Sequence, residues 1–261
     1  MGRIGGWLDP VRRSLDEQRA PVDLFIRDDD VGWDDQRLWP LLDLLATHAL
    51  PADLAVIPSE LSESLAQSLL ARSESAPHSL SFHQHGFAHA NHELTGRKYE
   101  FGPSRMGWLQ RRDIVEGRRR LGDQLGASVD PIFTPPWNRC TRTTGRCLVD
   151  LGFEVLSREA RATPLATEGL VELPVTIDWL ARRKQQRVSR GELGELLARC
   201  INGRGSIGLM FHHAAMDDDD REGAGELLPL LAGHDRVRAH GMLELARLHR
   251  SNSTLATEVK R

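Results

Sequence analysis

Long apolar runs, cysteines and aromatic residues are all scarce in this chain. No stretch approaches the roughly 20 apolar residues that a membrane helix needs, which excludes membrane insertion. The three cysteines include no CxxC pair and are odd in number, so a disulfide framework is not expected and a reducing compartment is favoured. The first residues also lack the apolar run of about 7–15 residues that a secretory signal contains. These absences together predict a cytoplasmic protein.

Neither sign of charge prevails. The 34 Lys and Arg residues against 37 Asp and Glu give a net charge of −3, so no basic surface is expected to recruit nucleic acid. Hydrophobic residues make up 40% of the 261 residues and charged residues 27%, with a mean hydropathy of −0.39. This balance is typical of a folded globular domain and excludes a disordered chain.

Short apolar runs alternate with longer amphipathic ones. The expected strands are Val22–Arg27, Asp53–Ile57, Leu80–His83, Pro131–Thr134, Phe153–Ser157, Leu170–Val175 and Ser206–His212. The expected helices are Asp35–His48, Ser59–Arg72, Arg105–Leu125, Thr143–Leu151, Arg190–Asn202 and Gly225–Ala232. The alternation indicates βαβ units around a parallel sheet, and the number of strands favours a closed or nearly closed barrel. We expect this domain to span residues 1–250 and a polar, frayed tail to span residues 251–261.

Residues suited to chemistry follow five of these strands. They are Asp28–Asp30, His83–His92, Pro135–Arg139, Asp178-Trp179 and His212-His213. Parallel α/β folds gather their strand-to-helix loops at the carboxyl ends of the strands, where ligands bind. The sequence therefore predicts that these five segments share one site.

The first segment holds three adjacent carboxylates, Asp28, Asp29 and Asp30. Neighbouring carboxylates repel one another unless a cation or a proton compensates, and a metal ion would leave one of them free to act as a base. An acidic helix cap accounts for one or two of them, but not for three behind an apolar strand. Two other charged segments are expected to be exposed to solvent and not to take part in chemistry. Asp217–Asp220 should form a solvated loop, and the arginines of residues 111–120 should form the solvated face of a helix.

The second segment holds four of the 11 histidines of the chain. His85 and His89 are four residues apart, so one helical turn would place both imidazoles on one face, within reach of one ion. His83 would share a strand face with His85, either supporting a ligand or lining the substrate pocket. His92 is expected to be exposed.

The remaining segments complete the predicted site. Pro135-Pro136 fixes the backbone before Trp137, whose N–H could then serve as an oxyanion donor beside a flat aromatic wall. Asp178 could orient a neighbouring group, and Trp179 could form an apolar wall of the pocket. One of the two histidines His212 and His213 is suited to act as general acid, because the ordinary pKa of histidine lies near neutrality.

In this order the segments resemble the NodB-like polysaccharide deacetylases of carbohydrate esterase family 4. The residues that carry the resemblance are Asp29-Asp30, His85–His89, Pro135–Trp137, Asp178-Trp179 and Met210–His212, and it extends from about Leu24 to Asp217. It implies an α/β fold, a deformed (β/α)7 barrel in a single domain. It also implies a hydrolase that removes N-acetyl groups from an N-acetylated sugar or sugar conjugate.

The resemblance implies a role for each residue. Asp30, His85 and His89 would hold one divalent ion, and Asp29 would take a proton from the attacking metal-bound water. His212 would protonate the departing amine, the N–H of Trp137 would stabilise the oxyanion, and Trp179 would line the acetyl pocket. Asp178, Arg139 and His83 are the other expected substrate contacts. An Asp/His/His set with open positions suits Zn²⁺ first, and also admits Co²⁺, Ni²⁺ or Mn²⁺.

Three positions depart from the family pattern. Thr134 stands where the family has an arginine that pairs with the catalytic Asp, and Arg139 or Arg27 would have to replace it. Gly86 stands where a Ser or Thr supports the loop. Because the chain has one Asp more than the family pattern, the base and the metal ligand are either Asp29 and Asp30 or Asp28 and Asp29. His213 remains an alternative to His212 as the general acid.

Two other functions fit the same residues. The site could hydrolyse a non-sugar amide, or the chain could be a carbohydrate-binding relative without turnover, for which the missing arginine argues. Asp29 and His212, which a pure binder does not need, favour catalysis. The substrate, the native metal and the oligomeric state are not determined by the sequence.

Overall fold

Strands and helices alternate along the chain, as predicted. The computed structural model describes residues 6–75, 79–183, 186–203 and 205–258. Its strands are β1 (Val22–Val31), β2 (Ala52–Val56), β3 (Leu80–His85), β4 (Val129–Thr134), β5 (Val155–Leu156), β6 (Val171–Glu172), β7 (Ile177–Asp178), β8 (Arg182–Arg183), β9 (Gln186–Arg187), β10 (Ile207–Phe211) and β11 (Val237–Ala239). Its α-helices are α1 (Asp9–Asp16), α2 (Asp35–Thr47), α3 (Glu63–Ser75), α4 (Gly107–Leu125), α5 (Arg142–Asp150), α6 (Arg190–Ile201), α7 (Asp218–Gly233) and α8 (Met242–Glu258).

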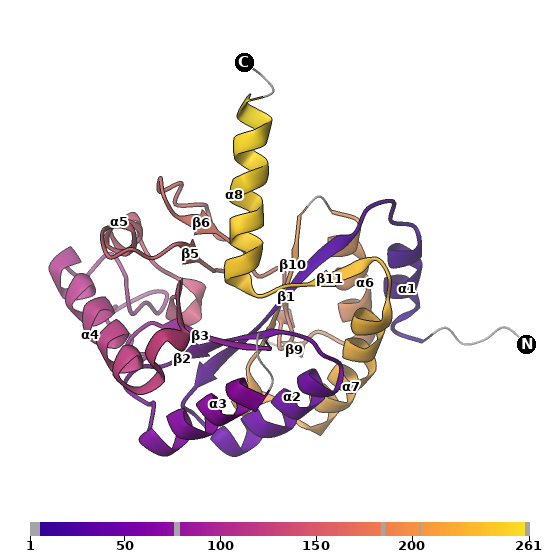
Figure 1. The fold of residues 1–261 in the computed structure, drawn as a ribbon, viewed down its shortest axis with the longest axis horizontal. Coiled ribbons are helices and arrows are strands. Elements are labelled where there is room, and N and C mark those ends of the chain that lie inside the picture. The colour runs from indigo at the N-terminus through magenta and orange to yellow at the C-terminus, as the bar shows by residue number, and fades with distance from the viewer. Residues whose placement is uncertain (1–5, 76–78, 184–185, 204, 259–261) are drawn as a thin grey trace, which may run out of the picture.

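A curled parallel sheet forms the centre of the molecule, with helices around it (Figure 1). Neighbouring strands follow the order β6-β5-β4-β3-β2-β1-β10-β7, and β11 adds to the first residues of β1. Every residue of β2 and β10 is buried, because helices on one side and the barrel interior on the other cover both faces. This is the α/β architecture with a deformed barrel that the sequence predicts.

The two end strands of the sheet belong to one extended segment. In its first half Val175 N–H donates to Arg158 O at 2.8 Å, and in its second half Thr176 N–H donates to Gly208 O at 2.9 Å. The segment therefore joins β5 to β10 and closes the sheet on itself. Gly208 allows this close approach, because a Cβ there would lie 2.6 Å from Pro174 O. The predicted strand Leu170–Val175 lies along β5 and the residues after it, and the ladder partner changes to β10 at Thr176, just beyond the predicted end.

Helix α8 covers the end of the barrel opposite the carboxyl ends of the strands. Its buried residues Met242, Leu245 and Ala246 pack with Phe25 and Ile132 of the barrel interior. Both carboxylate oxygens of Asp53 in β2 accept the Met242 N–H, at 3.1 and 3.0 Å, and so cap the start of α8. The rest of α8 rises away from the body (Figure 1). The predicted tail at residue 251 begins inside this helix, and residues 259–261 lie outside the described residues.

Two local predictions are corrected. Strand β1 does not end at Arg27 but continues to Val31, because each of the three carboxylates has a partner within the barrel. Asp217–Asp220 is not a solvated loop: Asp217 caps α7 through a reciprocal pair of hydrogen bonds with Asp220, and the helix follows directly. Helices α1 and α8 and the β8–β9 hairpin were not predicted.

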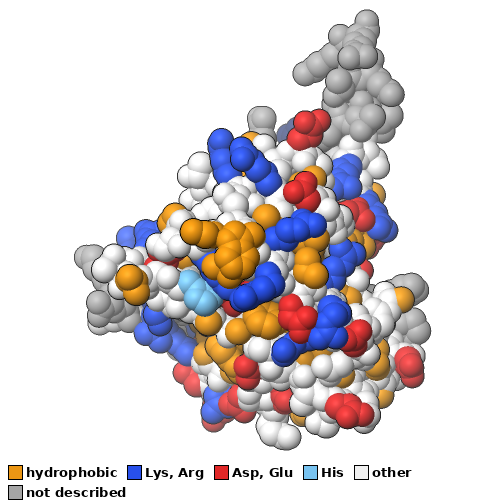
Figure 2. Space-filling model, turned by 90° about the vertical axis from the view of Figure 1, so that its left-hand side faces the viewer, with side chains coloured by type: hydrophobic (Ala, Val, Ile, Leu, Met, Phe, Trp, Pro, Cys, Tyr) orange, Lys and Arg blue, Asp and Glu red, His pale blue; other side chains and the backbone are white. Residues whose placement is uncertain are grey.

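Helix α4 presents the solvated face that its charge pattern predicts. Arg119 and Arg120 form ion pairs with Glu116 at 2.8 and 2.9 Å. Figure 2 shows basic, acidic and apolar side chains interspersed on the side of the molecule that carries this helix. Among the helices of the described ranges, none is both long and apolar enough to cross a membrane.

The role of α8 as the closing element can be measured. We expect Leu245→Ala to lower the free energy of unfolding by about 2–5 kcal/mol, because it opens a cavity in the barrel interior. Leu248→Ala, in the same helix and 42% exposed, should change it by less than about 0.5 kcal/mol. Urea unfolding of both variants tests this, and equal losses would show that α8 is not packed as described.

Candidate metal centre

Asp30, His85 and His89 lie together at the carboxyl ends of β1 and β3. Asp30 Oδ1 is 3.1 Å from His85 Nε2 and 3.3 Å from His89 Nε2, and the three ligand atoms all lie within 4.8 Å of one another. Residues 86–91 form a loop and not the helical turn from which the pairing was predicted. The loop returns His89 to His85 because Gly86 and His89 adopt left-handed backbone angles, with φ of 57° and 52°.

The three side chains present the right atoms to a divalent ion. His85 Nδ1 is 3.1 Å from the carbonyl oxygen of Thr134, which can only accept, so Nδ1 carries the proton and Nε2 faces Asp30. Burial opposes the charged form of His85, but its hydrogen bond to Asp30 and the nearby carboxylates outweigh this and raise its pKa. A cation between Asp30 and the imidazole nitrogen can take the place of that proton. Burial and the charge of His85 lower the pKa of His89 to about 4, so His89 is a neutral imidazole ready to bind an ion.

Two tryptophans enclose His89. The ring centroids of Trp33 and Trp137 lie 4.7 and 4.6 Å from that of His89, both edge to face. Trp137 follows Pro135-Pro136 and adopts a left-handed backbone, with φ of 56°. Trp33 is 37% exposed at the rim of the site and was not predicted. No sequence pattern marks it, since a single Trp after a strand is usually a packing residue.

Asp29 is held by Arg27, two residues before it on the same face of β1. The Nε of Arg27 is 2.7 Å from Asp29 Oδ1, and its Nη2 donates to Oδ2 at 2.9 Å. Both side chains are buried, and Arg27 also donates to Ser157 and Asn138. Burial favours the neutral acid, but the charge of Arg27 and of two histidines outweighs it and lowers the pKa of Asp29. Asp29 is therefore an ionised carboxylate of fixed orientation.

Arg27 thus does what the missing arginine at Thr134 would do. Thr134 instead supports His85, with its Oγ1 3.0 Å from Nδ1. Arg139, the other candidate, points elsewhere and donates to Lys98 O at 3.3 Å. The prediction left Arg27 and Arg139 open as partners of Asp29, and the geometry selects Arg27.

Asp28 forms a separate pair with His213. Its Oδ2 is 2.6 Å from His213 Nδ1, and the backbone N–H of His213 donates to Oδ1 at 3.0 Å. The Nε2 of His213 is 2.7 Å from Trp33 O, so both ring nitrogens face acceptors and the ring must be protonated. Burial opposes this charge, but Asp28 raises the pKa of His213 to about 9. Successive residues of a strand face opposite sides, so this pair lies apart from Asp29.

His212 occupies the position above Asp29. Its Nε2 is 4.0 Å from Asp29 Oδ2, and its side chain is 24% exposed. Its Nδ1 has no hydrogen-bond partner within the described ranges. The structure therefore brings Asp29 and His212 together, and it joins Asp28 and His213 to each other instead.

Comparisons with solved structures show the fold of this chain. No family model and no curated protein matches the chain. A structure from Mycobacterium smegmatis assigned as a polysaccharide deacetylase has 17% identity and a TM-score of 0.68, covering 90% of this chain and 94% of that one. A family 4 acetyl xylan esterase from Clostridium thermocellum, in complex with cobalt, has 17% identity and a TM-score of 0.57, covering 87% and 91%. The chain has the NodB-like fold of carbohydrate esterase family 4.

The same fold includes proteins that have lost activity. A family 4 pseudoenzyme from Bacillus anthracis has 12% identity to this chain and a TM-score of 0.57, covering 87% of this chain and 66% of that one. The fold therefore does not decide between turnover and binding. That question depends on the side chains of the site.

Two predicted substrate contacts lie elsewhere in this family 4 fold. Trp179 is 6% exposed, packs on Trp7 and Phe211, and donates to Asp220 O, so it belongs to the core below α7 and does not form a pocket wall. His83 is fully buried beside Arg27, and burial lowers its pKa to about 3. Neither of its ring nitrogens has a hydrogen-bond partner among the described residues, and His83 does not line the cavity next to Asn138.

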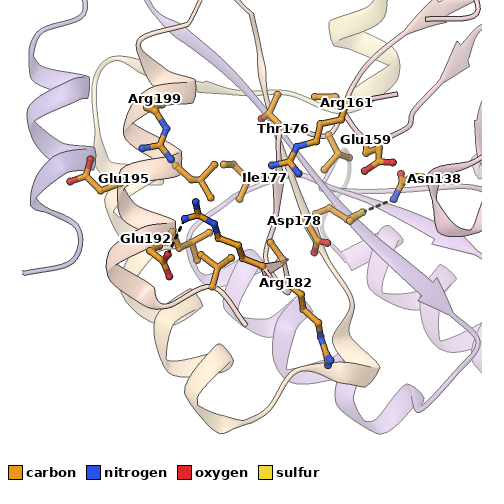
Figure 3. Close-up of a pocket in the computed structure, with 18 of the residues that line it drawn as sticks. Asn138, Glu159, Arg161, Thr176, Ile177, Asp178, Arg182, Glu192, Glu195 and Arg199 are labelled. Atoms are coloured by element: carbon orange, nitrogen blue, oxygen red, sulfur yellow. Dashed lines mark hydrogen bonds and ion pairs between the residues drawn. The ribbon is translucent and has the colours of Figure 1, made fainter. Parts of the chain in front are cut away.

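A cavity of about 910 Å³ lies next to Asn138 and Met210, the contacts of Arg27, and its lining does not include Asp29, His212 or the three candidate ligands. Asn138, Asp178 and Met210 line the end nearest Arg27, and α6 lines the far end (Figure 3). Burial raises the pKa of Asp178, whose Oδ1 accepts the Leu180 N–H at 2.9 Å. Figure 3 shows Arg161 and Glu159 at one wall and Arg199 and Glu192 across from them. The cavity is therefore polar and of the size of a small ligand.

The Asp28–His213 pair should make stability depend on pH. Its raised folded pKa means that its contribution is complete below the ordinary value of 6.5 and is lost as the pH rises through about 9. We expect the free energy of unfolding to fall by on the order of 3 kcal/mol across this window in the wild type. His213→Gln should flatten that decline in urea unfolding, whereas parallel curves would contradict the assignment.

Proposed function

We propose that this protein is a metal-dependent hydrolase that removes the acetyl group from an N-acetylated sugar or sugar conjugate. The observation that carries the proposal is the Asp30, His85 and His89 set beside an arginine-held Asp29 that faces His212. Structures of the same fold are named as a polysaccharide deacetylase and an acetyl xylan esterase bound to cobalt. A carboxylate and two imidazoles suit Zn²⁺ best among the common ions.

The proposed chemistry divides between a divalent ion, the side chains of Asp29, Arg27 and His212, and one backbone N–H. A divalent ion held by Asp30, His85 and His89 would act as a Lewis acid that polarises the amide carbonyl and lowers the pKa of a water. Asp29 would accept the proton of the attacking water, because Arg27 keeps its carboxylate ionised and oriented. The side chain of His212, exposed toward the substrate, would donate a proton to the leaving amine. The backbone N–H of Trp137 would donate to the oxyanion.

A sugar substrate accounts for the surroundings of the site better than a non-sugar amide. The faces of Trp33 and Trp137 next to His89 offer flat surfaces on which a sugar ring can stack. The adjoining cavity offers several hydrogen-bonding groups, among them Asn138, Asp178 and Arg161. A small apolar amide would use none of these hydrogen-bonding groups.

Turnover is favoured over binding alone. The main argument for a non-catalytic relative was the arginine missing at Thr134, and Arg27 supplies that group from another strand. A binding protein has no use for a base held in one orientation opposite a histidine. Asp29 and His212 are arranged in this way.

Metal content and acetate release test the proposal together. Wild-type protein loaded with Zn²⁺, Co²⁺, Ni²⁺ or Mn²⁺ should retain about one ion per chain by elemental analysis and release acetate from at least one of a panel of N-acetylated sugars. Asp30→Ala and the double variant His85→Ala/His89→Ala should lose both properties. Asp29→Asn should keep the ion and lose roughly 10²–10⁴-fold in rate.

His240→Gln serves as the matched control, because His240 follows β11 at the opposite end of the barrel and pairs with Asp23. It should keep the ion and the activity. Loaded wild-type protein that releases no acetate from any sugar, together with an Asp30→Ala variant that still binds the ion, would refute the proposal.

The role of Arg27 gives a separate prediction. Arg27→Lys keeps a positive charge but loses the planar fork that holds Asp29, so kcat/KM should fall roughly 10²-fold, by analogy with other positioning groups. The pKa of Asp29 should rise, which moves the acid limb of the pH profile to higher pH. Arg139→Lys is the control and should leave the profile unchanged. A shifted rate with an unshifted acid limb would contradict this role.

A further inference from the structure

The loop that carries His89 wraps around a buried carboxylate. Between Gly86 and His89, both in left-handed conformations, the backbone N–H groups of Phe87 and Ala88 point inward. They donate to Glu100, at 3.1 Å to Oε2 and 2.7 Å to Oε1. Successive peptide groups next to a left-handed residue commonly form such a concave anion site. Here the anion comes from the chain itself.

The N–H groups of Phe87 and Ala88, with smaller contributions from the Ala90 N–H and the charge of His85, compensate the charge of Glu100. Its side chain is fully buried, and no ion pair to it is found among the described residues. Burial raises its pKa, and the two peptide groups act in the opposite direction. The neighbouring Phe101 is also fully buried, with its ring 5.3 Å from that of Phe133, so Glu100 cannot turn out to solvent. Burying such a carboxylate costs free energy unless hydrogen bonds compensate its charge.

Gly86 is shaped to admit this carboxylate. A Cβ at Gly86 would overlap Glu100 Oε2 and lie 2.6 Å from Pro136 Cδ. A residue with a side chain at position 86 would therefore displace Glu100 from the loop. The support that the family pattern places at this position is absent, and Glu100 occupies the space from the far end of the same loop.

We propose that Glu100 is the positioning residue of the metal centre, holding the loop so that His89 reaches the ion beside Asp30 and His85. This inference rests on the proposed metal site. The three ligand atoms come from the ends of two strands, β1 and β3, and from a loop, and only His89 is not part of a strand. Without the carboxylate, the N–H groups of Phe87 and Ala88 lose their acceptor, and the loop is left with the bonds of Gly86 and of Phe87 O on the side away from His89. The ion then has two firm ligands in place of three.

Glu100→Gln is the main test, because the amide keeps the shape but removes the charge and presents a donor to one of the N–H groups. We expect the Kd for Zn²⁺, measured by competition with a chromophoric chelator, to rise at least roughly tenfold. The visible spectrum of the Co²⁺ form should also change, since it reports the number of ligands. Glu93→Gln is the matched control: Glu93 lies in the same loop but bonds Ser104 at 3.1 Å and not the peptide groups before His89. It should leave both readouts within about twofold.

Metal-free protein supplies a readout that does not need the ion. Hydrogen exchange at the Phe87 and Ala88 amides should be faster in Glu100→Gln by roughly tenfold or more, and unchanged in Glu93→Gln. If wild-type protein binds no ion, the proposed function fails, and this exchange measurement alone decides whether Glu100 holds the loop. If Glu100→Gln does not fold, Glu100→Asp takes its place, with the charge kept but one methylene shorter, and should show an intermediate loss of affinity. Wild-type affinity, spectrum and exchange in the folded variant would overturn the inference, as would equal losses in Glu93→Gln.

Discussion

The structure depends on burying three successive carboxylates in one strand. Asp28, Asp29 and Asp30 are adjacent in β1, and each has a different compensation. A protonated His213 pairs with Asp28, Arg27 pairs with Asp29, and two imidazoles face Asp30. Adjacent carboxylates that are buried or half-buried would repel one another without such partners. The compensation that each carboxylate receives also determines what it can do.

Because the three carboxylates have different partners, one of them serves the stability of the fold and the other two face the candidate metal centre. The Asp28–His213 pair lies on the opposite side of the strand and also fixes the Trp33 carbonyl, so it ties the first and last loops of the site together. The Asp29–Arg27 pair lies beside His212 and leaves an oriented base. Asp30 faces two nitrogen atoms whose lone pairs a metal can share. Strand alternation separates Asp28 from Asp29, and an irregularity in β1, with Asp30 at a left-handed φ of 66°, brings Asp30 to the same site as Asp29.

Two positions that depart from the family pattern are compensated from elsewhere in the chain. Arg27 on β1 replaces a group expected at Thr134 on β4, and Glu100 fills the space that Gly86 leaves empty. In both cases the charged group reaches the same point in space from a different element. A site is defined by the positions of its functional atoms, and a barrel offers several strands from which to reach them. A search for fixed residues at fixed positions would miss both.

Three features can be recognised in the sequence: the alternation of apolar runs, the residues that follow the strands, and the order of the five segments. They can be recognised because they follow from local periodicity and from the common direction of parallel strands. They were sufficient to predict the fold and the grouping of Asp30, His85 and His89. Which Asp faces the site, which of His212 and His213 is free, and which arginine holds Asp29 could not be predicted. The first two depend on the contact between Asp28 and His213, which are 185 residues apart. Arg27 lies only two residues from Asp29, but its guanidinium is oriented by Ser157 and Asn138, which are more than 100 residues away. Long-range packing places Trp179 in the core, and the cost of burying a charge determines the contacts of Glu100 under the His89 loop. Neither effect leaves a local pattern in the sequence, so neither could be predicted from it.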